Sequence, residues 1–153
     1  MSARVGVGYD SHPFAEERPL ILGGVEIPHD RGLAGHSDAD VLTHAVIDAV
    51  LGAAGLGDLG ILFPPDEEAW RDAHSLDLLA TAAGNLHGRV VNVDATLLCE
   101  EPRIGSHRAE MERNIGSVLS AAVSVKASTN EGMGWIGRRE GIGCVAVALV
   151  ELD

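Results

Sequence analysis

Aromatic side chains, basic side chains and cysteines are all scarce in this chain of 153 residues. Aromatics make up only 3% of it, so aliphatic side chains must fill the core. With 11 Lys and Arg against 23 Asp and Glu, the net charge of −12 argues against a protein that coats nucleic acid or an anionic membrane. No apolar run reaches the roughly 20 residues that span a bilayer. We therefore expect neither nucleic acid nor membrane as a partner.

Cysteine usage and the first residues bear on the cellular compartment. The two cysteines, Cys99 and Cys144, are far apart in the sequence and form no CxxC pair. The segment Met1–Val5 lacks the long apolar region of a signal peptide. We expect reduced, buried thiols and a cytoplasmic protein.

The remaining composition is that of one globular domain covering residues 1–153. Hydrophobic residues make up 46% and charged residues 22%, which argues against disorder. A chain of this length buries about 68–70% of its unfolded surface, enough for a sizeable core. The 19 glycines indicate tight turns or places where the backbone approaches a ligand.

Short extended stretches alternate with helical patterns along the chain. Strands are predicted at 4–10, 20–22, 25–27, 90–99, 123–128 and 142–152. Helices are predicted at 39–55, 75–86 and 106–121, and loops at 28–35, 57–72 and 129–141. Ser37 or Asp38 is expected to cap the first helix, and Ser75 the second. This order predicts an α/β (α+β) domain with helices on one face of a sheet.

The segment Asp10-Ser11-His12 stands where the first predicted strand ends. In an extended chain residues i and i+2 point the same way, so this carboxylate and imidazole can share one ion. A third ligand is expected from the helix that bears Asp40, His44 and Asp48, which recur every four residues along one stripe opposite much of the apolar face. One carboxylate and two histidines suit Zn²⁺ and leave a fourth position open. The alternative is that Asp10 caps a turn and the histidines are ordinary groups, because Asp-x-His is a short pattern.

Two loops carry polar groups suited to an anionic ligand. The segment Gly35–Asp40 places His36 and Ser37 at a helix start, where backbone N–H groups favour anions. Its alternative interpretation is a well-capped helix. The segments 57–60 and 63–66 are either a ligand loop or an ordinary turn.

The Gly-rich loop 129–141 offers a third set of polar groups. Thr129 supplies a hydroxyl and Glu131 a carboxylate, which suit a phosphate and a hard cation. A solvated loop charge is the alternative for Glu131.

The order and spacing of these pieces resemble one family, the 2-C-methyl-D-erythritol 2,4-cyclodiphosphate synthases of the non-mevalonate isoprenoid pathway. The resemblance covers almost the whole chain. It is carried by Arg4–His12, Leu22–Val25, Gly35–Asp40 with His44, Ala45 and Asp48, Leu51–Ala54, Gly57–Gly60, Leu62–Pro64, Glu101–Ile104, Val125–Ala127 and Gly137–Gly141.

The resemblance implies an activity and an assembly. Members convert 4-diphosphocytidyl-2-C-methyl-D-erythritol 2-phosphate to 2-C-methyl-D-erythritol 2,4-cyclodiphosphate and CMP, as metal-dependent phosphorus–oxygen lyases. The resemblance further implies a ferredoxin-like subunit and a homotrimer with active sites between adjacent subunits.

Residue roles follow by match to the family. Zinc is implied at Asp10, His12 and His44, and a Mg²⁺ or Mn²⁺ on the substrate diphosphate at Glu131. His36 and Thr129 are implied as catalytic groups beside the reacting phosphates. The methylerythritol part is implied to contact His36, Ser37, Asp58, Leu59, Gly60, Phe63, Pro64, Pro65, Asp66 and Glu67. Asp10, Ser11 and His12 are implied as further substrate contacts. The cytidine and phosphate contacts implied are Cys99, Glu100, Glu101, Pro102, Arg103, Ile104, Gly105, Ala127, Ser128, Thr129, Asn130, Glu131, Trp135 and Arg138.

The chain departs from the family pattern at four positions. Gly132 stands for a common Lys, Trp135 for a Phe and Arg139 for a Gly in the loop around Glu131. Ala39 stands for the usual Gly of the His-Ser-Asp-Gly-Asp segment, a small change.

The charge of the chain fits metal-assisted chemistry on such a substrate. A nucleotide diphosphate with a further phosphate is strongly anionic, so 11 basic side chains cannot dominate its binding and divalent cations must neutralise the reacting groups. The 2-phosphate is then an ionised nucleophile that needs no general base. Two other classes remain: a zinc phosphohydrolase in which water attacks, and a trimeric nucleotide-binding regulator of the same fold that catalyses nothing.

Overall fold

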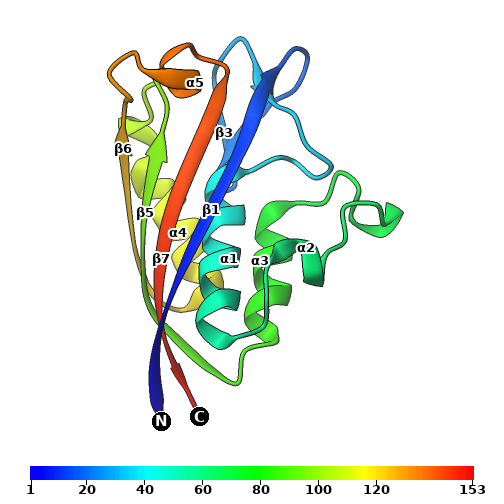
Figure 1. Ribbon diagram of the computed structural model, residues 1–153, viewed down its shortest axis with the longest axis vertical. Helices are drawn as coiled ribbons and strands as arrows, with labels where there is room; N and C mark the ends of the chain where they lie inside the picture. The colour runs from blue at the N-terminus through cyan, green and yellow to red at the C-terminus, as the bar shows by residue number, and fades with distance from the viewer.

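The computed structural model describes residues 1–153 as a sheet with helices on one side (Figure 1). The strands, in spatial order, are β4 (Gly32–Leu33), β1 (Ser2–Ala15), β7 (Gly141–Leu152), β5 (Gly88–Leu98) and β6 (Ala122–Ser128). A separate hairpin consists of β2 (Leu20–Leu22) and β3 (Val25–Ile27). The long helices are α1 (Val41–Ala54), α3 (Ser75–Gly84) and α4 (Arg108–Leu119). Helix α1 lies against β1 and β7, α4 lies against β6, and α3 packs on both helices.

The order of the elements departs from the ferredoxin-like topology in two connections. That topology runs β-α-β-β-α-β, whereas here the main elements follow one another as β1, α1, α3, β5, α4, β6 and β7. The last strand is antiparallel to both β1 and β5 and therefore occupies the middle of the sheet, while β5 and β6 are parallel. The expected α/β layering with helices on one face is confirmed, but the ferredoxin-like connectivity is wrong. Helix α4 joins β5 to β6, where that topology connects two strands directly, and a loop joins β6 to β7, where it has a helix.

Two glycines let α1 approach β1 closely. A Cβ atom on Gly8 would lie 1.9 Å from the carbonyl oxygen of Ala45, and one on Gly6 would lie 2.0 Å from that of Ala49. Because Gly6 and Gly8 have no side chains, α1 packs directly against the strand that bears Asp10. Because α1 lies between the sheet and α3, it is buried on nearly every side. The predicted stripe of Asp40, His44 and Asp48 is therefore buried or half-buried and does not face solvent.

The helix caps also differ from expectation. The cap of α1 is Asp40, whose side chain accepts the N–H of Thr43 at 3.0 Å, and not Ser37 or Asp38. Ala39 has a φ of 58°, so the chain does not turn helical before Asp40. Ser75 is the first residue of α3 and donates its N–H to a carboxylate oxygen of Asp38 at 2.9 Å instead of capping the helix itself.

The predicted loops contain short elements that no periodicity revealed. Strand β4 lies within 28–35, and α2 (Leu59–Leu62) and the 3₁₀ turn η1 (Glu68–Trp70) lie within 57–72. A further turn η2 (Gly105–His107) precedes α4, and α5 (Gly134–Gly137) lies within 129–141. Strand β1 extends to Ala15, because residues 11–13 continue the ladder with β7 and Phe14 and Ala15 pair with β4.

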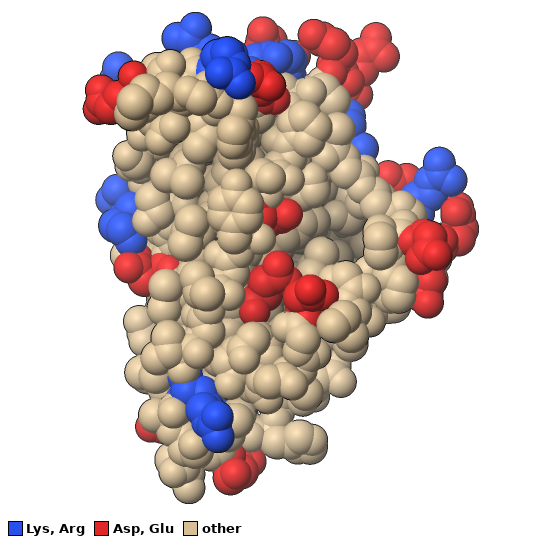
Figure 2. Space-filling view, in the orientation of Figure 1, with Lys and Arg blue, Asp and Glu red and all other residues tan.

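The face of the sheet opposite the helices is apolar and exposed. Val5 is 70% exposed, Val7 66% and Tyr9 54%, and Val147 on the neighbouring strand is 42% exposed. Figure 2 shows mostly uncharged surface in this view, with a few acidic side chains near the middle and charged side chains of both signs at the edges. Exposed apolar side chains of two neighbouring strands therefore gather on this face of the sheet.

None of the helices has the length and apolar character needed to cross a membrane. Both cysteines, Cys99 and Cys144, are free and buried, as expected from the sequence.

Candidate active site

Three side chains from β1 and α1 converge as a metal-ligand set. Atom Oδ2 of Asp10 lies 2.8 Å from Nε2 of His12 and 3.2 Å from Nδ1 of His44, and the two ring nitrogens are 3.4 Å apart. Ligand atoms about 2.0–2.1 Å from a tetrahedral zinc stand about 3.3 Å from one another. The donor types and their spacing therefore fit a zinc ion with one position left for a ligand, and this group of three could hold a metal ion.

The remaining ring nitrogens of both histidines are oriented by neighbouring oxygens. Nδ1 of His12 lies 2.9 Å from the carbonyl oxygen of Ala34, which can only accept, so the hydrogen sits on Nδ1 and Nε2 keeps its lone pair. Nε2 of His44 lies 3.1 Å from Oγ of Ser37 and can donate to it, which frees Nδ1. Such outer contacts fix the tautomer and orientation of metal-binding histidines.

Electrostatics in the metal-free group favour an ionised Asp10. Burial raises the pKa of this carboxyl, but its hydrogen bonds with His12 and His44 outweigh burial and lower the pKa to about 2. Burial lowers the pKa of His44, while Asp10 and Asp40 raise it to a net value above the usual one. A metal ion that binds here therefore competes with protons for His44.

Asp40, on the same stripe as His44, has a structural role. It is fully buried, and its carboxylate accepts the N–H groups of Gly23 and Gly24 at 2.9 Å and that of Thr43 at 3.0 Å. The hydroxyls of Thr43 and Ser75 also donate to it, at 2.8 Å and 2.6 Å. Asp40 thus ties the β2–β3 hairpin and α3 to the start of α1 and is no metal ligand.

Asp48 anchors the segment that follows α1. Its Oδ1 accepts the N–H of Leu59 at 2.7 Å, and Asp58 caps α2 by accepting the N–H of Ile61 at 3.0 Å. Burial raises the pKa of Asp48, and the charges of Asp58 and Asp10 raise it further, against the lowering effect of the Leu59 N–H. The family resemblance implies that Asp58 contacts the ligand. In the structure, Asp58 also stabilises its own loop by capping α2.

The metal-ligand set opens into a cavity of about 170 Å³. Its lining brings together residues predicted from separate loops and consists of Asp10, His12, His36, Ser37, His44, Leu59, Phe63, Pro65, Trp70 and Leu78. Trp70 and Leu78 were not predicted. Trp70 packs edge-on against Phe63 with ring centroids 4.8 Å apart, and a tryptophan in a polar loop of an aromatic-poor chain is a signal that could have found it.

The remaining residues of this segment lie around the cavity instead of lining it, and they are Asp58, Gly60, Pro64, Asp66 and Glu67. The carbonyl oxygen of Glu67 lies 3.0 Å from Nε2 of His36. Arg18, also unpredicted, donates to the carbonyl oxygens of Gly35 and Ser37, on either side of His36, at 3.2 Å and 2.8 Å. His36 is therefore held from two sides at the mouth of the cavity.

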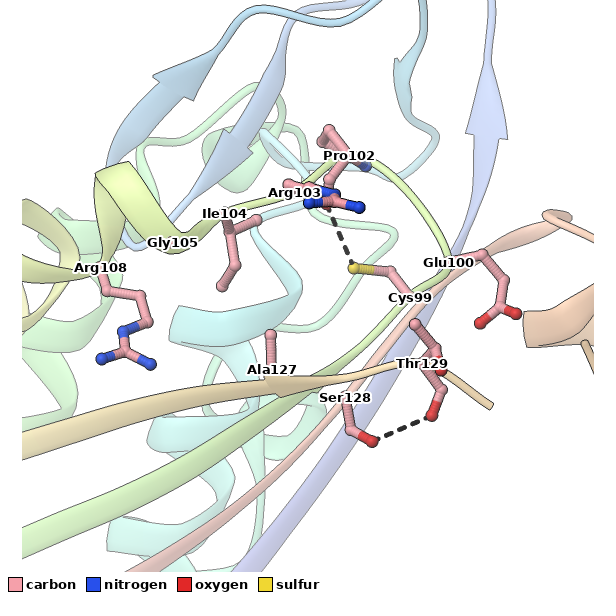
Figure 3. A pocket seen from close by; sticks show the side chains of 10 residues that line it. All are labelled: Cys99, Glu100, Pro102, Arg103, Ile104, Gly105, Arg108, Ala127, Ser128 and Thr129. Carbon is pink, nitrogen blue, oxygen red and sulfur yellow. Dashed lines mark hydrogen bonds between the residues drawn. The ribbon is translucent and has the colours of Figure 1, made fainter. Parts of the chain in front are cut away.

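A second cavity, of about 380 Å³, lies where β5 and β6 end (Figure 3). Ten residues line it, namely Cys99, Glu100, Pro102, Arg103, Ile104, Gly105, Arg108, Ala127, Ser128 and Thr129. All but Arg108 were predicted to contact a ligand, and Glu101, also predicted, is not among them. Arg108 comes from the first turn of α4, which tertiary packing turns toward the cavity. Burial and, secondly, Glu100 raise the pKa of Cys99 to about 11, so this thiol is protonated and unreactive at neutral pH.

The loop beyond Thr129 presents Glu131 to solvent. Glu131 has a φ of 54°, and its N–H lies 3.3 Å from Oγ1 of Thr129. The Glu131 carboxylate takes part in no hydrogen bond or ion pair, so it is free to bind a cation. Asn130 forms part of the same turn by donating its side-chain amide to the carbonyl oxygen of Met133.

Ser11, Trp135 and Arg138 lie away from both cavities. Ser11 and Trp135 line a separate hollow of about 170 Å³ that His12 also borders. Arg138 is exposed and forms an ion pair with Glu140 at 2.6 Å.

The metal-ligand cavity and the second cavity share no residue within one chain. Strand register nevertheless puts them at the same level of the sheet. Asp10 pairs with Cys144 on β7, Cys144 pairs with Leu97 on β5, and Leu97 pairs with Ala127 on β6. Strand β7 therefore separates the two cavities.

The chain is similar to known proteins along almost its whole length. The model of the YgbB family matches residues 3–151. The 2-C-methyl-D-erythritol 2,4-cyclodiphosphate synthase of Symbiobacterium thermophilum is 55% identical over 152 residues, covering 95% of this chain and 97% of the relative.

Solved structures show the same similarity. The IspF of Plasmodium falciparum in complex with CDP is 34% identical with a TM-score of 0.85, over 99% of this chain and 97% of that one. The bifunctional IspDF of Campylobacter jejuni is 38% identical with a TM-score of 0.92 over 99% of this chain, which spans 43% of that longer protein.

Proposed function

Because the chain belongs to the YgbB family, we infer that it cyclises 4-diphosphocytidyl-2-C-methyl-D-erythritol 2-phosphate to 2-C-methyl-D-erythritol 2,4-cyclodiphosphate in isoprenoid biosynthesis, with release of CMP. One synthase domain spans residues 1–153. The observation that carries this proposal is the open three-ligand group of Asp10, His12 and His44 at the head of a cavity. The free, buried thiols support a cytoplasmic location.

We propose that zinc is held by Asp10, His12 and His44, and that Glu131 helps to hold a Mg²⁺ or Mn²⁺ on the substrate diphosphate. When bound, the two cations neutralise phosphate charge and stabilise the charge that develops on departing CMP, which makes the enzyme a metal-dependent phosphorus–oxygen lyase. His36, held by Arg18 and Glu67, orients the methylerythritol-bearing phosphate at the mouth of the cavity. Catalysis on this chain is then mainly positioning and electrostatics.

The second cavity is proposed to bind the cytidine diphosphate part of the substrate. Its volume of about 380 Å³ is in the range of small-molecule sites, and the similar Plasmodium falciparum protein was solved with CDP. Arg103 and Arg108 supply positive charge to this cavity in a chain that is otherwise acidic. Thr129 borders the same cavity next to Glu131, where a hydroxyl can bond a reacting phosphate.

The nucleophile separates cyclisation from hydrolysis. In cyclisation an oxygen of the 2-phosphate attacks the phosphorus nearer methylerythritol, a P–O–P ring linkage forms, and the bond to CMP breaks. An intramolecular attack of this kind has an effective molarity of roughly 10⁵–10⁸ M and outcompetes water. We therefore expect turnover in ¹⁸O-labelled water to give CMP and a cyclic diphosphate that both lack the label, as measured by mass spectrometry.

Label in CMP or in an open-chain phosphate would mean that water attacks and that the protein is a zinc phosphohydrolase. Binding of CDP without any conversion of the substrate would identify a nucleotide-binding regulator instead.

We further propose a homotrimer whose active sites lie between adjacent subunits. The exposed apolar sheet face around Val5, Val7 and Val147 supplies a surface for self-association. The separation of the two cavities by β7 within one chain supports a site in which the metal-ligand cavity of one subunit meets the second cavity of its neighbour. A closed threefold ring repeats this contact three times.

Mixing two inactive variants tests whether the site is shared. His44→Ala disables the metal-ligand cavity, and Ala127→Trp fills the second cavity with a large ring. If sites combine cavities of neighbouring subunits, random mixed trimers from coexpression are expected to recover about one quarter of wild-type activity. Each variant alone stays inactive, and light scattering should give three times the 16.0 kDa subunit mass. Mixed assemblies without activity, or an active monomer, would contradict the shared site.

A further inference from the structure

Glu100 was assigned to ligand contact from the sequence, yet both of its carboxylate oxygens are occupied by backbone groups. Oε2 accepts the N–H of Asn130 and Oε1 accepts the N–H of Gly132, each at 2.8 Å. These two amides flank Glu131 on either side. Figure 3 shows the Glu100 side chain directed away from Arg108 and Ala127.

The loop that donates these two hydrogen bonds to Glu100 has an unfavourable backbone conformation. Glu131 has a φ of 54° and Gly132 a φ of 75°, both in the left-handed region. A non-glycine residue there costs energy and persists only where surrounding contacts impose it. Successive N–H groups in such a turn form a concave anion-binding site, and a carboxylate that accepts two of them makes strong, charge-assisted bonds.

Few other contacts determine where Glu131 points. Its own carboxylate has no hydrogen-bond or ion-pair partner, and its N–H reaches only Oγ1 of Thr129, at 3.3 Å. The position of the Glu131 carboxylate therefore depends on its backbone. Asn130 and Met133 close the turn by hydrogen bonds between themselves, and the two bonds to Glu100 tie that turn to the end of β5. Glu100 reaches across from the end of β5, a strand hydrogen-bonded to both β6 and β7, so the loop is tied to a rigid element.

We propose that Glu100 is a positioning residue that holds the Thr129–Gly132 loop so that Glu131 presents its carboxylate to a divalent cation on the substrate diphosphate. This inference rests on the cation-binding role proposed above for Glu131. It predicts that loss of Glu100 frees the loop and weakens the cation site without removing any group that touches the cation. Loss of an outer contact of this kind typically lowers metal affinity about 10–100-fold.

The test uses full-length protein and compares Glu100→Ala, Glu100→Gln, Glu131→Gln and the control Glu16→Ala. Glu16 is an exposed carboxylate in the turn after β1, away from both cavities. Mn²⁺ affinity is measured by electron paramagnetic resonance in the presence of CDP. Amide hydrogen exchange at Asn130 and Gly132 is measured in the metal-free protein, so it reports the loop independently of activity.

We expect Glu100→Ala to weaken Mn²⁺ binding by about 10-fold or more and to speed exchange at both amides. Glu100→Gln should fall between Ala and wild type, because the amide keeps one acceptor oxygen for one of the two N–H groups. Glu16→Ala should match wild type. In turnover, raising the Mn²⁺ concentration should restore kcat further for Glu100→Ala than for Glu131→Gln, because Glu100→Ala retains the cation ligand itself.

Unchanged Mn²⁺ affinity in Glu100→Ala, with affinity lost in Glu131→Gln, would overturn the positioning role alone. Unchanged affinity in Glu131→Gln would overturn the proposed cation-binding role of Glu131 and this inference with it. The two failures are therefore distinguishable by the same titration.

Discussion

Replacing His44 with alanine is expected to remove bound zinc from the protein and to lower turnover by about 10³-fold or more. His44 supplies one of only three ligand atoms, and its Nδ1 lies 3.2 Å from Asp10 and 3.4 Å from His12. Two remaining ligands do not define a tetrahedral site. Alanine is the best helix former, so α1 should persist in the variant. Metal analysis of the purified protein and a mass-based assay of CMP release measure the two effects.

A matched histidine variant separates the ligand role from a general effect of losing an imidazole. His87 is exposed, and its side chain has no polar partner. His87→Ala should keep one zinc per chain and full turnover. Full zinc occupancy in His44→Ala, with a circular dichroism spectrum like that of wild type, would refute the ligand assignment.

The long helices and strands were predictable because their periodicity is local. The strand predicted at 142–152 and the helix predicted at 39–55 are confirmed as β7 and α1, with only small shifts of their ends. Elements α2, α5 and β4 were missed, because each is shorter than the window over which a period can be recognised. The place of β7 in the middle of the sheet depends on pairing with two strands far apart in the chain, which no local pattern encodes.

The residues of the candidate site also fall into those that a local pattern predicts and those that depend on contacts between distant segments. Asp10 and His12 come together through strand geometry alone, and helical spacing directed attention to His44. The same spacing could not separate His44 from Asp40 and Asp48, because, apart from Thr43, the partners that occupy those carboxylates lie 11 to 35 residues away along the chain. Arg108 and Trp70 reach their cavities only through tertiary packing.

Asp40→Ala is expected to reduce the free energy of unfolding by about 3–4 kcal/mol, the largest stability effect predicted for this chain. The carboxylate is fully buried, and five donors from Gly23, Gly24, Thr43 and Ser75 converge on it. Removing it leaves these donors in a site with no other acceptor, and each unsatisfied buried donor costs about 1–3 kcal/mol, reduced by relaxation and water entry. Urea denaturation at one fixed protein concentration measures the loss.

Ser75→Ala is the matched control, because it removes one donor and leaves Asp40 with the other four. Its expected cost is about 1 kcal/mol, the net value of a single hydrogen bond. Since Asp40 joins the β2–β3 hairpin to the helix that carries His44, Asp40→Ala should also weaken zinc binding, whereas Ser75→Ala should not. If Asp40→Ala cost no more than Ser75→Ala, the hairpin and α3 would have to be held to α1 by packing alone, and Asp40 would lose the role assigned to it.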